Sequence, residues 1–119
     1  MLTAEMLLKD KFFAGTVNRA YYSCLQYVLH VLLEKLGHTR EDLEKIPRDG
    51  THNKAQYLLE LSLVGKDKGA YKWIQQKLPE FKKERVIADY FGDPLDADRG
   101  QTAINMANAI MTTLRTHYK

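Results

Sequence analysis

The sequence contains few cysteines, which could crosslink the chain, and few prolines, which interrupt helices and strands. Its 119 residues include one cysteine, Cys24, and three prolines. A single cysteine excludes an intramolecular disulfide, and because Cys24 lies in an apolar stretch we expect a buried, unreactive thiol. The chain is therefore expected to fold on its hydrophobic core, without crosslinks or metal.

Targeting segments and long apolar runs are also missing. No uninterrupted apolar stretch approaches the ~20 residues that span a bilayer, and neither end has a basic segment followed by an apolar run and a cleavage site. We expect a soluble cytoplasmic protein that does not contact a membrane. The formal net charge of +3 permits contact with a polyanion, but many soluble proteins are equally basic. Charge alone therefore predicts no partner.

Several motifs that carry catalytic chemistry are absent as well. The sequence has no glycine-rich phosphate loop and no glycine-flanked nucleophilic serine. His30, His38 and His117 lack the close paired spacing of a zinc site. We therefore expect neither a metal nor a cofactor.

The composition is that of one globular domain. Hydrophobic residues make up 45% of the chain and charged residues 28%, which excludes a disordered protein. A compact chain of this length buries roughly two-thirds of its unfolded surface around one core. Residues 1–119 are therefore expected to form a single domain.

Apolar residues recur at helical spacing along most of the chain. The expected helices cover residues 3–11, 12–36, 52–64, 68–91 and 96–117, and a short helical turn near 40–45 stays open. The segment 12–36 is apolar almost all round, which indicates either the central helix of a bundle or an oligomer contact. No alternating strand pattern appears, so we predict an all-α fold, an antiparallel up-and-down bundle of four to five helices.

Capping and breaking residues define the predicted helix ends. Thr3 and Thr51 are expected N-caps, and Gly37 is expected just past the end of the long helix. Gly65 is expected to end the helix 52–64, and Gly92-Asp93-Pro94 the helix 68–91. Pro79 is expected either to kink the helix 68–91 or to begin the second of two abutting helices.

Arg85 lies on the apolar stripe of its segment, between Phe81 and Ala88. A guanidinium keeps its charge, so burial there requires a hydrogen-bonded partner, and Asp89 lies four residues on. Two interpretations stay open on residue chemistry alone. The pair is either a local surface ion pair worth about 0.2–0.5 kcal/mol or a pair that faces a cleft or a partner subunit.

A second polar group interrupts the most apolar segment. Asn18 and Arg19 are followed closely by Tyr22. These residues form either a solvated strip with arginine–tyrosine stacking or a basic, aromatic surface that holds phosphate and base. Asn18, Arg19 and Tyr22 are therefore candidate binding residues.

Two runs of the sequence together resemble the HEPN domain family. Residues 18–22, Asn-Arg-Ala-Tyr-Tyr, resemble the opening of the long helix in these domains. Residues 85–90, Arg-Val-Ile-Ala-Asp-Tyr, are similar to the arginine, two residues, alanine-aspartate-tyrosine segment near the end of their fourth helix. His52 is similar to the histidine that they often place before their third helix. The resemblance covers nearly the whole chain.

The resemblance implies a module of a prokaryotic toxin–antitoxin or defence system, directed at RNA or acting with a nucleotidyltransferase antitoxin. It also implies a homodimer that brings two copies of one motif together across a cleft. Many HEPN proteins are metal-independent ribonucleases, whose motif is an arginine, then four to six intervening residues, then a histidine. Here the positions four to seven after Arg85 hold Asp89, Tyr90, Phe91 and Gly92, and no histidine appears before His117. Histidine supplies an acid and base near neutrality for attack by a ribose 2′-hydroxyl, and Asp89 beside an arginine does not.

Three function hypotheses follow. The leading one is the dimeric HEPN-type module with an incomplete catalytic motif. The second is an active metal-independent ribonuclease, with the candidate catalytic residues Arg85, Asp89, Tyr90 and His52. The third is a non-catalytic dimeric interaction protein, in which the segment 12–36 contacts the partner and the pair Arg85–Asp89 only fixes helix packing.

Overall fold

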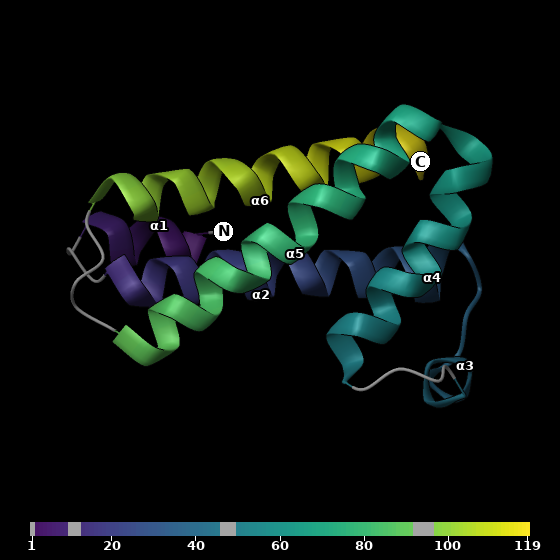
Figure 1. The fold of residues 1–119 in the computed structure, drawn as a ribbon, viewed down its shortest axis with the longest axis horizontal. Coiled ribbons are helices and arrows are strands. Elements are labelled where there is room, and N and C mark those ends of the chain that lie inside the picture. Colours follow the sequence, from purple (N-terminus) through teal and green to yellow (C-terminus); the bar gives the residue numbers. More distant parts are fainter. Residues whose placement is uncertain (1, 10–12, 46–49, 92–96) are drawn as a thin grey trace.

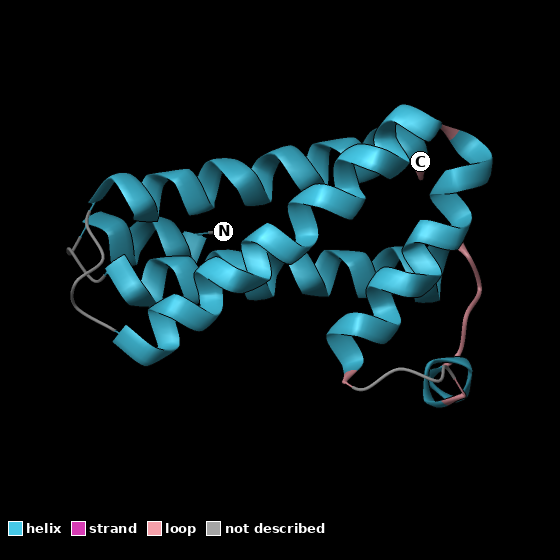
Figure 2. Cartoon of the chain, in the orientation of Figure 1, coloured by secondary structure: helices cyan, strands magenta, loops and turns pink. Residues whose placement is uncertain are grey.

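The computed structural model describes residues 2–9, 13–45, 50–91 and 97–119, and the fold within these ranges is entirely helical (Figures 1 and 2). The elements in chain order are α1 (Leu2–Lys9), α2 (Phe13–His30), the π-helical turn η1 (Val31–Lys35), α3 (Arg40–Glu44), α4 (Thr51–Lys66), α5 (Lys68–Phe91) and α6 (Ala97–His117). The predicted all-α class is confirmed. The predicted break at Gly92-Asp93-Pro94 and the predicted helix start at Asp96 lie outside the described residues.

α2 is the central helix of the bundle. It packs against α1, α4, α5 and α6, and in Figure 1 α5 crosses it obliquely while α6 runs alongside. A helix with so many neighbours must be apolar on several sides, as the sequence of 12–36 predicted. The largest fully buried side chains come from α2, η1, α4, α5 and α6 and include Val17, Val28, Leu32, Leu59, Leu63, Ile74, Phe81, Ile110 and Leu114.

The long second helix ends where the sequence predicted. Its last turn widens to a π-helix, and the backbone N–H of Leu36 donates to the carbonyl of Val31 at 3.0 Å. Gly37 follows with φ +71°, and the N–H of His38 donates to the carbonyl of Leu32 at 2.9 Å. These bonds satisfy carbonyls that a helix end leaves open, and the positive φ explains why glycine stands at 37.

The predicted N-caps were wrong. α1 already includes Leu2, so Thr3 lies inside the helix. The N-cap of α4 is Gly50, whose φ of +81° suits glycine, and Thr51 is the first residue of that helix. A threonine does cap α3. The Thr39 Oγ1 accepts a hydrogen bond from the N–H of Asp42, and the N–H of Thr39 donates to the Asp42 carboxylate.

The predicted end of the third helix was also wrong. Gly65 lies within α4, which continues to Lys66. Asp67 ends it, because its backbone is extended and its carboxylate accepts the N–H of Ala70 at 3.0 Å, which caps the start of α5. Pro79 lies within α5, which is continuous from Lys68 to Phe91. The proline therefore begins no second helix, and Leu78 and Phe81 on either side of it are both buried in the core.

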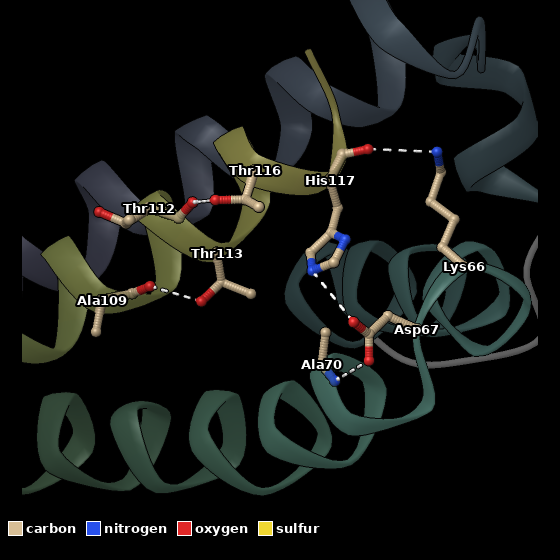
Figure 3. Close-up of polar contacts among 8 residues, drawn as sticks. All are labelled: Lys66, Asp67, Ala70, Ala109, Thr112, Thr113, Thr116 and His117. Atoms are coloured by element: carbon tan, nitrogen blue, oxygen red, sulfur yellow. Dashed lines mark hydrogen bonds and ion pairs between the residues drawn. The ribbon is translucent and has the colours of Figure 1, made fainter.

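The C-terminal end of α6 is fastened to the corner between α4 and α5 (Figure 3). The ammonium of Lys66 donates to the carbonyl of His117 at 3.3 Å, and the His117 Nε2 lies 3.8 Å from the Asp67 Oδ2. The buried Tyr118 donates its hydroxyl to the Ser62 Oγ at 2.7 Å. α6 is thereby tied to the end of the bundle away from residues 85–91.

None of the described helices combines the length and the apolar character that crossing a membrane requires.

Candidate functional site

The two sequence segments singled out above meet where α5 crosses α2. The Asn18 Nδ2 donates to the Asp89 Oδ1 at 2.6 Å, although the two residues are 71 positions apart. The Arg85 Nη1 donates to the other carboxylate oxygen, Asp89 Oδ2, at 2.9 Å. Each oxygen of Asp89 thus has a side-chain donor, and the carboxylate joins the two helices.

Aromatic rings surround the guanidinium of Arg85. Its Cζ lies 5.5 Å from the ring centroid of Tyr21 and 5.8 Å from that of Tyr22, within cation–π range of both. The two rings meet edge to face, and Tyr21 packs in the same manner on Phe81. Burial raises the pKa of Tyr21 to about 12, although the charge of Arg85 acts in the opposite direction. Tyr21 therefore stays a neutral phenol that packs against the arginine.

The ion pair between Arg85 and Asp89 is more than a local contact on one helix. The Arg85 side chain is 18% exposed, and its Nε is buried without a hydrogen-bond partner among the described residues. The Asp89 side chain is 39% exposed. Because Asn18 adds a bond from α2, the cluster positions α5 on α2 and leaves one edge of the carboxylate towards solvent.

A surface pocket of about 610 Å³ opens beside this cluster. The described residues that line it are Gly15, Asn18, Arg19, Tyr22, Gln26, Ala88 and Asp89. Arg19 is exposed and makes no ion pair within the described ranges, so its guanidinium is available to an incoming anion. The pocket combines this cation, the half-buried ring of Tyr22 and polar side chains from both helices.

The sequence-predicted residues separate into three groups. Asn18, Arg19, Tyr22 and Asp89 line the pocket, and Arg85 supports it through Asp89. Tyr90 is 82% exposed and does not line it, so the structure does not bring this tyrosine to the other candidates. His52 belongs to the first turn of α4, but its side chain lies outside the described part of the structure.

Three lining residues, Gly15, Gln26 and Ala88, were not predicted as site residues. A signal for Gly15 and Gln26 was present, because positions 15, 18, 19, 22 and 26 follow the spacings that place residues on one helix face. Gly15 and Gln26 carry no charge or ring, so they gave no chemical reason to extend the face beyond Asn18 and Tyr22. Tyr21 was predicted as part of the apolar stripe and as an aromatic neighbour of Asn18 and Arg19, and its contact with Arg85 depends on the crossing of α2 and α5.

The chemistry of the cluster favours binding over proton transfer. Both oxygens of Asp89 accept hydrogen bonds from side chains, which makes the carboxylate a fixed acceptor within the fold. Cys24 is buried, as predicted, and burial raises the pKa of its thiol to about 12, so it stays protonated. Within the described residues, no three histidine, cysteine, aspartate or glutamate side chains form a group that could hold a metal ion.

Comparisons of this chain with protein-family models, with curated proteins and with solved structures give no match.

Proposed function

We propose that this chain is an HEPN-type module of a prokaryotic toxin–antitoxin or defence system that binds single-stranded RNA in the pocket between α2 and α5. The observation that carries this proposal is the convergence of Arg19, Tyr22 and the Asn18–Asp89–Arg85 cluster at one pocket. The resemblance of residues 18–22 and 85–90 to the HEPN family, which involves the same side chains, also supports it.

The chemistry of the pocket suits a nucleotide. The guanidinium of Arg19 offers a planar, permanently charged donor to a phosphate. The ring of Tyr22 offers a face to an unpaired base, a contact worth roughly 1–3 kcal/mol per base. Asn18 and Asp89 present polar groups between the two helices, next to where the base edge would lie. Phosphate contacts of this kind fix the position of the strand, and polar groups at a base edge select the base.

RNA binding without cleavage is the form of the proposal that the residues support best. The motif histidine is absent, and Asp89 is held by two donors at 2.6 and 2.9 Å. Cleavage through a 2′-hydroxyl needs a group that exchanges a proton near neutrality. In this proposal the module acts as a homodimer, and chemistry on the RNA or regulation of the module falls to a partner such as a nucleotidyltransferase antitoxin.

The test is binding of a fluorescein-labelled 12-nucleotide uridine RNA to the full chain. Binding is measured by fluorescence anisotropy, with a chelator present throughout. Arg19→Ala is expected to weaken binding about fivefold by removing one phosphate contact, and Tyr22→Leu about tenfold by removing a stacking surface. Arg40→Ala, which removes an exposed arginine from α3, is the matched control and is expected to change affinity less than twofold.

Four results would contradict the proposal in separate ways. Absence of RNA binding by the wild-type chain overturns it. Equal losses in Arg19→Ala and Arg40→Ala show nonspecific attraction and remove the pocket from the mechanism. Cleavage of the RNA by the wild type, abolished in Arg85→Ala, replaces it with the ribonuclease hypothesis. A strictly monomeric chain at micromolar concentration, measured by sedimentation, excludes the homodimer.

A further inference from the structure

α4 and α5 form a second concave surface on the other side of α5. The two helices meet at their shared turn and spread apart towards the start of α4 and the end of α5 (Figure 1). A groove of about 1070 Å³ lies between them, lined by Tyr57 and Glu60 of α4 and by Pro79, Lys82, Lys83 and Val86 of α5, among others. It shares no lining residue with the pocket between α2 and α5.

Exposed apolar side chains gather on these two helices. Of the five large apolar residues that are exposed in the described ranges, four belong to α4 or α5, namely Leu61, Val64, Val86 and Tyr90. Leu61 and Val64 line a smaller pocket that shares Tyr57 and Glu60 with the groove, so the apolar surface is continuous. Apolar patches of this kind mark protein contacts. Three of the four, Leu61, Val64 and Val86, are aliphatic side chains that gain from burial against a protein, which favours a protein partner.

The charges in the groove are unbalanced. Lys82 donates to the amide oxygen of Asn53 at 3.3 Å, and neither Lys82 nor Lys83 has a carboxylate within ion-pair distance among the described residues. The acidic side chain in the described lining, Glu60, already accepts a hydrogen bond from Gln56 at 3.1 Å. The described lining therefore carries two lysines against one glutamate, a net positive charge that a partner with carboxylates would complement.

We propose that the groove between α4 and α5 binds an acidic amphipathic helix of a partner protein. Two diverging helices offer a seat for a third, whose apolar residues at helical spacing fill the space between them. Tyr57, Pro79 and Val86 contact the apolar face of that helix, and its carboxylates face the ammonium groups of Lys82 and Lys83. This inference uses none of the residues of the proposed RNA pocket and holds whether or not RNA binds there.

The first arm of the test uses two synthetic peptides and the full wild-type chain. Both peptides are labelled 20-residue helices with leucines at helical spacing. One carries glutamates on the flanks of its apolar face, and the other carries lysines at the same positions. The acidic peptide is expected to bind at least about tenfold more tightly than the basic one, with a preference that shrinks as salt is added. Equal affinity for the two peptides overturns the proposal.

The second arm places the contact on the groove. Lys83→Glu is expected to weaken binding of the acidic peptide about fivefold and to strengthen binding of the basic one. Lys119→Glu makes the same charge change two residues beyond α6 and is expected to alter neither affinity by more than about twofold. Equal effects of the two variants contradict the proposed location. Thermal unfolding monitored by circular dichroism verifies that both variants fold.

Val86→Asp tests the apolar part of the contact. It is expected to weaken binding of the acidic peptide about tenfold, since it replaces an aliphatic contact with a negative charge. A different result would assign the groove to nucleic acid and overturn the proposal. In that result the acidic peptide fails to bind, while a uridine RNA binds the wild type and no longer binds Lys83→Glu or Val86→Asp. If RNA binding is lost in Arg19→Ala but not in Lys83→Glu or Val86→Asp, the proposal for the groove is unaffected. The two proposals can therefore be refuted separately.

Discussion

The two ends of α5 are each anchored by an aspartate, but in different ways. Asp67, just before the helix, accepts the backbone N–H of Ala70 and lies beside His117 of α6. Asp89, near the other end, accepts only side-chain donors in the described structure, Asn18 of α2 and Arg85 of α5. Asp67 caps its own helix, which is a local task. Asp89 joins helices that are distant in the sequence, and a pocket with an unpaired arginine opens next to it. The two aspartates therefore differ in their donors: a backbone N–H for Asp67, which has a structural role, and side chains for Asp89, which lies at the candidate site.

The largest expected loss of stability comes from removing the ion pair at the Asp89 end of α5. Arg85→Ala removes the cation between Tyr21 and Tyr22 and leaves Asp89 with one side-chain donor, so we expect a loss of about 2 kcal/mol in the free energy of unfolding. Urea denaturation measures it, with Arg40→Ala as the control that removes an exposed arginine. RNA affinity is expected to fall as well. A loss of stability with unchanged RNA affinity would favour the hypothesis that the pair only fixes helix packing.

A smaller effect is expected from loosening the corner that Asp67 occupies. Tyr118→Phe removes the hydroxyl that donates to Ser62 at 2.7 Å and is expected to cost about 1 kcal/mol of unfolding free energy. The double variant Tyr118→Phe/Ser62→Ala removes both partners and is expected to recover part of that loss, since no polar group is left without its bond. If the double variant loses more unfolding free energy than the two single variants lose together, the hydrogen bond is not the cause of the loss.

The smallest effect is a pH dependence of the Asp67 cap. The bond from the N–H of Ala70 lowers the pKa of Asp67, and the second bond from Gly69 and the charge of His117 act in the same direction. A carboxyl whose folded-state pKa is lowered contributes stability above its unfolded value, about 3.9, and loses it as pH falls through the folded value. Asp67→Asn keeps the capping oxygen but not the charge. The melting temperature of the wild type is therefore expected to exceed that of Asp67→Asn by about 2 °C at pH 7 and to equal it near pH 2. A gap that widens in acid would refute this account.

Most of the fold could be predicted because it depends on periodicity. Ile74, Leu78, Phe81 and Ala88 recur at helical spacing, and all four are buried in the structure. Helix ends were harder to predict, since they depend on backbone conformation. Gly50 and Thr51 are both acceptable caps by composition, and only the φ of +81° at Gly50 decides between them.

The candidate site was predicted in pieces. The pair Arg85–Asp89 is four residues apart on one helix, so its contact follows from local geometry. The bond from Asn18 to Asp89 spans 71 positions and depends on the angle at which α5 crosses α2. Tyr90, next to Asp89 in the sequence, points to solvent because successive helical residues face different sides.

The sequence by itself determined which segments are helical and which side of each is apolar, because backbone hydrogen bonding and side-chain periodicity act over a few residues. It also placed Arg85 and Asp89 on one face. Only the tertiary structure decided that α2 supplies Asn18, Arg19 and Tyr22 to the same pocket, and that α4 and α5 diverge to leave a groove. Those features depend on how helices cross, and crossing angles follow from the packing of many side chains at once.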